Sequence, residues 1–329
     1  MKAVSLFSGG LDSQLAVRLM QNQGVVVTAI NFSSPFFGAD ERTKRAAHQL
    51  GIELLIKPVG EEYLERVLRN PVYGYGKNLN PCIDCHGFMF RKAGDLMHDL
   101  GASFIVTGEV LGQRPMSQNR SALNAVDKLS GYKGYIVRPL SGRLLEATIP
   151  EKEGWIDRQL MLDISGRGRT RQMELAEEFG IQEYPSPAGG CLLTEQNYAR
   201  RLKEILNLIE HPRPEDLDIL KIGRHFYLEA GLLLAVGRNH SENARLEAQS
   251  RSSDRLIKVT DRPGPVGLLR PILPIDPSPH LTYAGSIVAR YSDAKNEKTA
   301  PVKVYTKDGE ITETFVVIPL PQDQIPATV

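Results

Sequence analysis

The chain has 329 residues, and its 40 Lys and Arg residues nearly balance 39 Asp and Glu, for a formal net charge of +1. This balance excludes a generally basic protein that coats nucleic acid, so any RNA contact must depend on local patches. A hydrophobic content of 41% excludes wholesale disorder, and the length allows two domains. No apolar run has the length of a membrane helix or of a signal-peptide core, so we expect a cytoplasmic protein with no membrane partner.

Short apolar runs alternate with helical segments in the first half of the chain. Strands are expected at residues 3–7, 25–30, 53–56 and 104–107, and helices at 11–20, 41–50 and 90–100. This alternation predicts an α/β fold, a doubly wound parallel sheet with helices on both faces. Residues 150–207 look mostly helical, and they carry Arg167, Arg169 and Arg171 in close succession.

Strand-like runs predominate in the last third of the chain. Residues 302–305 and 311–317 flank Asp308-Gly309, which is typical of a β-hairpin turn. We expect a domain boundary near residue 211. The predicted domains are a catalytic domain at 1–210 and a smaller α+β domain, rich in strands, at 211–329.

The segment Ser8-Gly9-Gly10-Leu11-Asp12-Ser13 lies between the first expected strand and the first expected helix. Adjacent glycines let the backbone approach a polyphosphate, and the helix N-terminus offers free N–H groups to it. Ser8 and Ser13 can add hydroxyl donors, and Asp12 can hold Mg²⁺. The segment lacks the Gly-Lys-Ser/Thr of a Walker-type loop. The alternative is a plain turn in which Asp12 caps the helix.

Cys82 and Cys85 flank two residues at the start of a helix, and Cys191 follows Gly189-Gly190. A close pair with a distant third cysteine can form a three-thiolate metal or cluster site. A helix N-terminus favours the thiolate form of Cys82 and Cys85. A structural zinc with His86 as fourth ligand, and buried thiols without any metal, remain open. The spacing Cys82-x-x-Cys85-His86 also matches the motif for c-type haem attachment, but that chemistry occurs in exported proteins.

The Ser8–Ser13 segment resembles the SGGxDS signature of the PP-loop ATP pyrophosphatases. That resemblance implies a HUP-like doubly wound domain in which ATP is split into AMP and pyrophosphate, and the AMP activates a carbonyl oxygen. ATP and Mg²⁺ are the implied ligands, and Asp12 is the implied catalytic carboxylate. The cofactor-binding residues that we expect are Phe7, Ser8, Gly9, Gly10, Asp12, Ser13 and Gly108.

Three further segments, 80–85, 104–109 and 189–195, are similar to the ordered motifs of tRNA thiouridine synthetases, notably the 2-thiouridylase group. In members with three such cysteines, these hold a [4Fe–4S] cluster whose fourth iron binds sulfide. Relatives without a cluster keep two cysteines as nucleophile and persulfide carrier. The resemblance implies that Cys82, Cys85 and Cys191 are catalytic and are the protein ligands of the cluster, near the Ser8–Ser13 loop. The Thr-Gly-His of many relatives is Thr107-Gly108-Glu109 here, so that histidine is absent.

Segments 220–228 and 236–243 are rich in Arg, His, aromatic and amide groups, which contact RNA phosphates and bases in many proteins. A plain sheet edge with charged residues for solubility is the alternative. The region resembles the RNA-binding domain found at the end of NFACT proteins. Stretches similar to the THUMP or rhodanese modules of many 4-thiouridine synthetases are not evident. The sulfur is therefore expected from an external donor, either sulfide or a persulfide carrier.

Together these features predict an ATP-dependent tRNA sulfurtransferase that adenylates a uridine carbonyl oxygen and replaces it with sulfur through the three-cysteine [4Fe–4S] site. The alternatives are an enzyme that removes sulfur from tRNA, an amidotransferase-like PP-loop enzyme, and an RNA-binding protein that holds a nucleotide. The sequence leaves four questions open: which uridine is modified, which donor supplies the sulfur, whether the cysteines bind zinc or a cluster, and whether the protein is a monomer or a homodimer.

Overall fold

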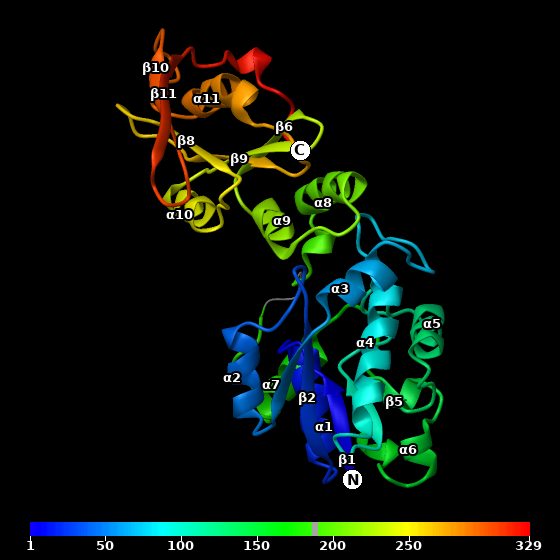
Figure 1. Cartoon of the computed structure of the whole chain (residues 1–329). Helices are drawn as coiled ribbons and strands as arrows, with labels where there is room; N and C mark the ends of the chain where they lie inside the picture. Colours follow the sequence, from blue (N-terminus) through cyan, green and yellow to red (C-terminus); the bar gives the residue numbers. More distant parts are fainter. Residues whose placement is uncertain (186–189) are drawn as a thin grey trace. The chain divides into compact units, whose positions relative to one another are not determined.

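The computed structural model describes residues 1–185 and 190–329, which form two compact units, Met1–Thr194 and Glu195–Val329 (Figure 1). Gly189 of the cysteine-containing segment lies outside the described residues. In the part of the chain that is described, no helix is both long and apolar enough to cross a membrane.

The division between the units falls earlier in the chain than the predicted boundary near residue 211. Helix α8 (Gln196–Leu208) belongs to the second unit because its arginine Arg201 donates hydrogen bonds to carbonyl oxygens there. The acceptors are Leu220 at 2.8 Å, Val329 at 3.0 Å and Gly223 at 3.1 Å. A long polar side chain that reaches three distant backbone groups leaves no periodic signal in the sequence.

The first unit is built on a five-stranded parallel sheet in the order β3-β2-β1-β4-β5. The strands are β1 (Lys2–Leu6), β2 (Val26–Ser33), β3 (Leu54–Pro58), β4 (Phe104–Thr107) and β5 (Ile136–Val137). The central strand β1 pairs on one side with β2 and on the other with β4, so the chain winds in both directions from it. The predicted doubly wound α/β fold is confirmed.

Helices cover both faces of this sheet (Figure 1). One face packs against α1 (Leu11–Gln21), α2 (Glu41–Gln49) and α7 (Thr170–Glu178), which contribute Leu15, Ala46 and Leu175 to a shared core. The other face packs against α4 (Cys82–Met97), which is followed by α5 (Arg120–Ser130). The remaining short helices are α3 (Gly60–Tyr63) and α6 (Ile149–Lys152).

Helix α4 differs from the predicted helix at 90–100. It begins at Cys82 and ends at Met97, so the two cysteines form its first turn. In its described residues, the segment 150–207, predicted as mostly helical, holds α7, α8 and the short helical turns Arg158–Leu160 and Leu192–Thr194.

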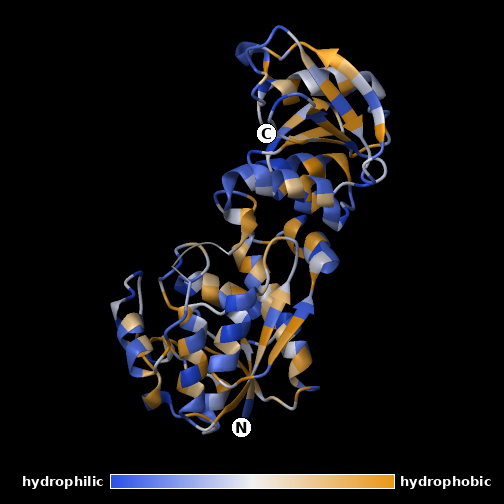
Figure 2. Cartoon of the chain, turned by 90° about the vertical axis from the view of Figure 1, so that its left-hand side faces the viewer, coloured by the Kyte–Doolittle hydropathy of each residue, from blue (hydrophilic) through white to orange (hydrophobic). Residues whose placement is uncertain are grey.

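The second unit contains a six-stranded antiparallel sheet in the order β11-β10-β8-β9-β7-β6. Its strands are β6 (Arg224–Glu229), β7 (Leu232–Val236), β8 (Arg255–Val259), β9 (Gly267–Pro271), β10 (Ala300–Tyr305) and β11 (Ile311–Val317). Its helices besides α8 are α9 (Pro214–Asp218), α10 (His240–Ala248) and α11 (Leu281–Arg290). The strands carry most of the hydrophobic colour of this unit, and the helices show mixed faces (Figure 2). The predicted strand-rich α+β domain and its hairpin at 302–317 are confirmed.

Candidate active site at the carboxyl ends of the parallel strands

The Ser8–Ser13 loop connects β1 to α1 at the carboxyl end of the sheet. Gly9 has φ +73°, and a Cβ there would lie 2.8 Å from the Cα of Thr43. Position 9 therefore requires glycine for two reasons, the left-handed backbone and the close approach of α2. The Ser13 hydroxyl donates to the Gly10 carbonyl at 2.8 Å and fixes the turn from the other side.

Gly10 is glycine for a different reason. Its backbone is extended (φ −72°, ψ 160°), and a Cβ would meet only the Ser8 hydroxyl at 3.3 Å. The fold itself would accept another residue here. Gly10 caps α1 without a side chain, and the first helical bond runs from the Gln14 N–H to the Gly10 carbonyl. No side chain caps the first N–H groups of α1, so they are available to an anion such as phosphate.

Gly108 and Phe7 hold the loop in place. A Cβ on Gly108, directly after β4, would lie 2.5 Å from the backbone of Asp12 and Ser13, so the end of β4 packs against the first turn of α1. The Phe7 ring is in the core, and its backbone N–H and carbonyl bond to Ile30 and Asn31. Phe7 therefore supports the loop from behind, and its predicted contact with cofactor stays a prediction.

Asp12 presents one satisfied and one open carboxylate oxygen. Oδ2 accepts a hydrogen bond from the Gln113 amide at 3.0 Å, while Oδ1 is buried without a hydrogen-bond partner among the described residues. Burial raises the pKa of the Asp12 carboxyl, against the opposing effects of the Gln113 amide, of Arg169 and Arg114, and of the nearby Gln172 amide. A buried, unpartnered carboxylate oxygen beside an anion-binding helix end fits a divalent cation.

The two cysteines of α4 are anchored by polar contacts around its first turn. Asp84 accepts the backbone N–H groups of Val72 and Tyr73 at 2.6 and 3.0 Å, which holds the preceding loop against the helix. The Asn80 amide donates to the Cys82 sulfur at 3.2 Å. These contacts fix where Cys82 and Cys85 point.

Cys191 reaches the same region from far along the chain. The N–H of Leu192 donates to the carbonyl of Phe36, just beyond the end of β2, at 3.0 Å. The Asn78 amide donates to the carbonyl of Thr194 at 2.7 Å, which joins the segment to the loop before α4. The Arg114 guanidinium acts on both Asp12 and Cys191, lowering the pKa of each against the larger effect of burial.

The three thiols influence one another electrostatically. Burial raises the pKa of Cys85 well above its usual range, the Tyr63 hydroxyl partly opposes this, and Cys191 and Cys82 raise the pKa further. Burial likewise raises the pKa of Cys191, with Cys82 adding to the effect. The prediction of a thiolate at the helix N-terminus is therefore wrong for Cys85 in the metal-free protein, because loss of solvent outweighs the helix dipole.

No group of three or more His, Cys, Asp or Glu residues in ranges 1–185 and 190–329 is gathered closely enough for a single metal ion. The choice between a cluster and a structural zinc therefore stays a prediction.

Tyr63 was not identified from the sequence. It is fully buried on α3, with its ring 6.0 Å from Phe88 and 5.0 Å from Phe37. Its hydroxyl has no nitrogen or oxygen partner among the described residues, and its polar neighbour is the Cys85 thiol. Burial raises the pKa of Tyr63, and the proximity of Cys85, Cys191 and Cys82 raises it further. A tyrosine in an apolar stretch gives no signal of this position, because most buried tyrosines pair within the protein.

Glu109, where many relatives have histidine, holds a histidine from another element. Its carboxylate contacts His86 Nδ1 at 2.6 Å and accepts from Arg138 at 2.9 Å. Burial works to raise the pKa of Glu109, but Arg138 and His86 together hold it below its ordinary value. His86, next to Cys85 on α4, is thus fixed by a buried network that also includes Asp127.

The segments predicted to contact RNA, 220–228 and 236–243, have structural roles at most of their polar positions. His225 and Phe226 are fully buried, and the His225 ring bonds to the Ile222 carbonyl at 2.8 Å. Arg238 pairs with Glu242, and Asn239 caps α10. Some of these side chains complete the fold of the second unit, whereas Arg238, Asn239, His240 and Ser241 are exposed, so the RNA contact of these segments stays a prediction.

Two family profiles match the chain. Residues 1–149 match the family described as thiamine biosynthesis protein (ThiI), and residues 223–328 match the NFACT protein RNA binding domain. The tRNA-specific 2-thiouridylase MnmA of Methylorubrum extorquens is 25% identical over 301 residues, which cover 79% of this chain and 73% of that protein.

A probable tRNA sulfurtransferase of Staphylococcus aureus (strain Newman) is 31% identical over 146 residues, 42% of this chain and 34% of that protein. The chain thus spans about a third of that relative. Among solved structures, a 4-thiouridine synthetase–RNA complex with bound ATP aligns with a TM-score of 0.40 and 22% identity, covering 67% of this chain and 49% of that one. Residues 1–149 of this chain are thus similar to the ThiI family and residues 223–328 to the NFACT RNA-binding domain family, and each match covers less than half of the chain.

Proposed function

We propose that the protein is an ATP-dependent tRNA sulfurtransferase that uses three cysteines to place sulfur on a uridine. The observation that carries this proposal is the open Asp12 Oδ1 beside a bare helix N-terminus, in the same unit as three convergent thiols. A phosphate loop alone is compatible with many ATP-using enzymes. The thiols add the sulfur chemistry.

In this proposal the triphosphate of ATP lies against Gly9 and Gly10 and the first N–H groups of α1. Asp12 Oδ1 holds the Mg²⁺ that accompanies it, and Gln113 keeps the carboxylate oriented through Oδ2. Arg169 and Arg114, both close enough to affect the Asp12 pKa, supply positive charge for the departing pyrophosphate.

The proposed reaction has two displacements. The carbonyl oxygen of the uridine attacks the α-phosphorus of ATP, an oxygen–phosphorus bond forms, and pyrophosphate leaves. Hydrosulfide from the external donor then attacks the activated carbon; a persulfide donor first releases hydrosulfide to a thiol reductant, which becomes a disulfide. A carbon–sulfur bond forms, the carbon–oxygen bond breaks, and AMP leaves with the oxygen. The chain contributes mainly by holding both reactants in line.

Cys82, Cys85 and Cys191 are the proposed ligands of a [4Fe–4S] cluster. When bound, such a cluster supplies an iron with an open position for sulfide. Around the thiols, the Asn80 amide already donates to Cys82, and the Tyr63 hydroxyl is positioned to donate near Cys85. These groups orient and stabilise sulfur ligands.

The tRNA substrate is supported by the family of residues 1–149 and by the RNA-binding family of residues 223–328. The boundary between the catalytic and RNA-binding parts is proposed near the division of the two units.

The direct test replaces Asp12 by Asn and measures tRNA-dependent pyrophosphate release. We expect a loss of at least ~100-fold, since the cation site and its charge are removed. The melting temperature should not fall, because a desolvated carboxylate is removed. Asp99→Asn, at an exposed position, is the matched control. Wild-type release by the Asp12 variant would exclude this role for the loop.

The sulfur site is tested separately by anaerobic purification followed by iron, sulfide and zinc analysis. We expect a brown protein with near-equal iron and inorganic sulfide, and loss of both when Cys82, Cys85 or Cys191 is replaced by Ser. A colourless protein with zinc and no sulfide would contradict the cluster.

A further inference from the structure

The sheet of the second unit has one face covered by α11 and an opposite face that is only partly covered. On this opposite face, side chains from β7 and β9 are completely buried; they are Leu233, Ala235, Leu268 and Arg270. Along β8, β10 and β11 the same face becomes accessible. Lys258 and Lys303 are half-buried there, and Thr314 and Val316 are exposed, Val316 to 61%. We name these four residues the lysine face.

Strand register places the two lysines side by side. Lys303 on β10 lies directly opposite Lys258 on β8, and their side chains point to the same side of the sheet. Like charges at directly opposite positions destabilise a sheet. Lysines often protect the outermost strand of a sheet, but β8 and β10 are both interior strands, so that explanation does not apply.

Neither lysine has a carboxylate partner among the residues that the structure describes. The Lys303 ammonium lies 5.3 Å from the centre of the Tyr305 ring. The Glu247 carboxylate of α10 lies near Tyr305, but its partner is the Tyr305 hydroxyl, from which it accepts a hydrogen bond at 2.7 Å, and not a lysine. Glu313 of β11 is opposite Val304, whose side chain lies in the core beneath α11.

The neighbours of the lysines suit a phosphate backbone. Thr314, directly opposite Lys303 on β11, supplies a hydroxyl donor, and Val316 two residues further supplies apolar surface for a ribose or base. Two adjacent ammonium groups, a hydroxyl and an apolar side chain on an open sheet match the mixed chemistry of single-stranded or looped RNA.

We propose that the lysine face is a surface through which the second unit contacts the sugar–phosphate backbone of tRNA. This inference rests on the proposed function, since it names the surface by which that substrate is held. The repulsion between Lys258 and Lys303 is tolerated in the free protein and is relieved when phosphates neutralise both charges.

The test compares two full-length variants that each lose two positive charges. Lys258→Gln with Lys303→Gln alters the lysine face, and Lys203→Gln with Lys295→Gln alters exposed lysines on α8 and after α11. Binding of unmodified tRNA is measured across a range of salt concentrations. We expect the lysine-face variant to bind at least ~10-fold more weakly and the slope of log K against log salt to fall by about 1.5, as for two lost phosphate contacts. The control should keep the wild-type slope.

Stability of the free protein gives a second readout. Removing the like-charge pair should raise the melting temperature of the second unit by about 2 °C. A merely structural role for these lysines would lower it.

The possible outcomes distinguish failure of the lysine-face proposal from failure of the proposed function. If wild-type protein binds tRNA and the lysine-face variant keeps its affinity and slope, the inference is overturned while the proposed function stands. A change of oligomeric mass with unchanged tRNA binding would identify a second copy of the chain as the occupant and would also overturn it. If the wild-type protein fails to bind tRNA at all, both are overturned.

Discussion

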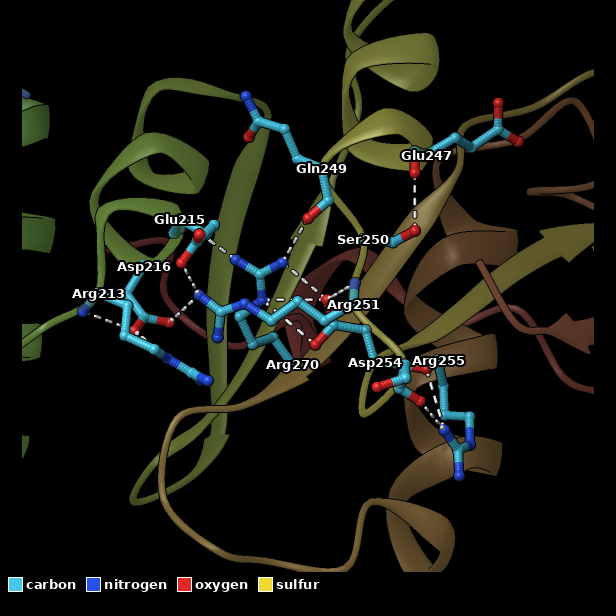
Figure 3. Close-up of polar contacts among 11 residues, drawn as sticks. Arg213, Glu215, Asp216, Glu247, Gln249, Ser250, Arg251, Asp254, Arg255 and Arg270 are labelled. Atoms are coloured by element: carbon cyan, nitrogen blue, oxygen red, sulfur yellow. Dashed lines mark hydrogen bonds and ion pairs between the residues drawn. The ribbon is translucent and has the colours of Figure 1, made fainter. Parts of the chain in front are cut away.

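Both units bury polar side chains. In the second unit, the largest buried side chain, Arg270, has all of its surroundings supplied with hydrogen-bond acceptors. Arg270 of the second unit is fully buried, and its guanidinium is surrounded by acceptors (Figure 3). It donates to both carboxylate oxygens of Asp254, at 2.7 to 3.2 Å, and to the carbonyls of Glu215 and Gln249, each at 2.8 Å. Nothing at this arginine is left for a ligand.

The candidate site of the first unit shows the opposite condition. Asp12 Oδ1 and the Tyr63 hydroxyl are buried, and neither has a nitrogen or oxygen partner within the described residues. An unsatisfied buried polar group costs about 1–3 kcal/mol. Other buried atoms, such as the Tyr227 hydroxyl of the second unit, share this condition, so it does not by itself indicate a ligand. Asp12 and Tyr63 differ in their surroundings, because Asp12 lies in the first turn of α1 and Tyr63 lies beside the thiols.

The largest expected effect comes from breaking the satisfied network. Arg270→Leu leaves the Asp254 carboxylate buried without its cation, and we expect the second unit to lose about 3–5 kcal/mol of stability. Differential scanning calorimetry should show the transition of the second unit shift or disappear while that of the first unit remains.

A double variant sharpens this result. Arg270→Leu with Asp254→Leu removes both charges, so part of the lost stability should return. Arg255→Leu, whose guanidinium bonds only backbone carbonyls at a half-exposed position, is the control and should cost less than ~1 kcal/mol. A double variant as unstable as the single one would show that hydrogen bonds to Glu215 and Gln249, rather than the ion pair, carry the stability.

A smaller effect is expected from pH, again in the second unit. His225 is fully buried beside Arg201, and burial with this neighbouring charge lowers its pKa to about 3 from the ordinary 6.5. The folded state therefore stays unprotonated while the unfolded chain takes up a proton below pH 6.5. The contribution of His225 to the free energy of unfolding is therefore fully present above pH 6.5. It falls as the pH drops, by about 2 kcal/mol at pH 5.

Melting of wild type and His225→Gln between pH 7 and 5 checks this expectation. Gln can still donate to the Ile222 carbonyl but does not titrate, so the variant should lose less stability over that interval. His98→Gln, at an almost fully exposed position, should behave as wild type. Parallel pH curves for all three proteins would remove His225 as the source of acid sensitivity.

Much of the fold follows from local sequence. Apolar runs ended by glycines predicted the parallel strands, and Asp308-Gly309 predicted the hairpin between β10 and β11. The Ser8–Ser13 loop was predicted for the same reason, since Gly9 at positive φ and the bare Gly10 are encoded within a few residues. Structural features that depend on residues close together in the sequence can therefore be predicted from the sequence.

The site's surroundings could not be predicted because they depend on contacts between distant segments. Gln113 and Arg169 meet Asp12 from other loops, and Tyr63 meets Cys85 only through the packing of α3 on α4. Burial also reversed the expectation for the Cys85 thiol. His225 of β6 and Glu242 of α10 are buried for the same reason, since tertiary packing rather than residue type decides which side chains face solvent.

The smallest expected effect on stability tests the open group of the first unit. Tyr63→Phe removes a buried hydroxyl whose polar neighbour is the weakly hydrogen-bonding Cys85 thiol, so the melting temperature of the metal-free protein should change little. If the hydroxyl donates to a sulfur ligand, the reconstituted variant should have a more negative cluster reduction potential and release iron to a chelator faster, because hydrogen bonds to sulfur stabilise the reduced cluster. Tyr75→Phe is the control, since its hydroxyl already donates to the Leu68 carbonyl at 2.6 Å and should affect folding rather than potential. A Tyr63 variant with unaltered potential and unaltered iron release would place its hydroxyl outside the sulfur site, and the contrast with Arg270 would then rest on Asp12 alone.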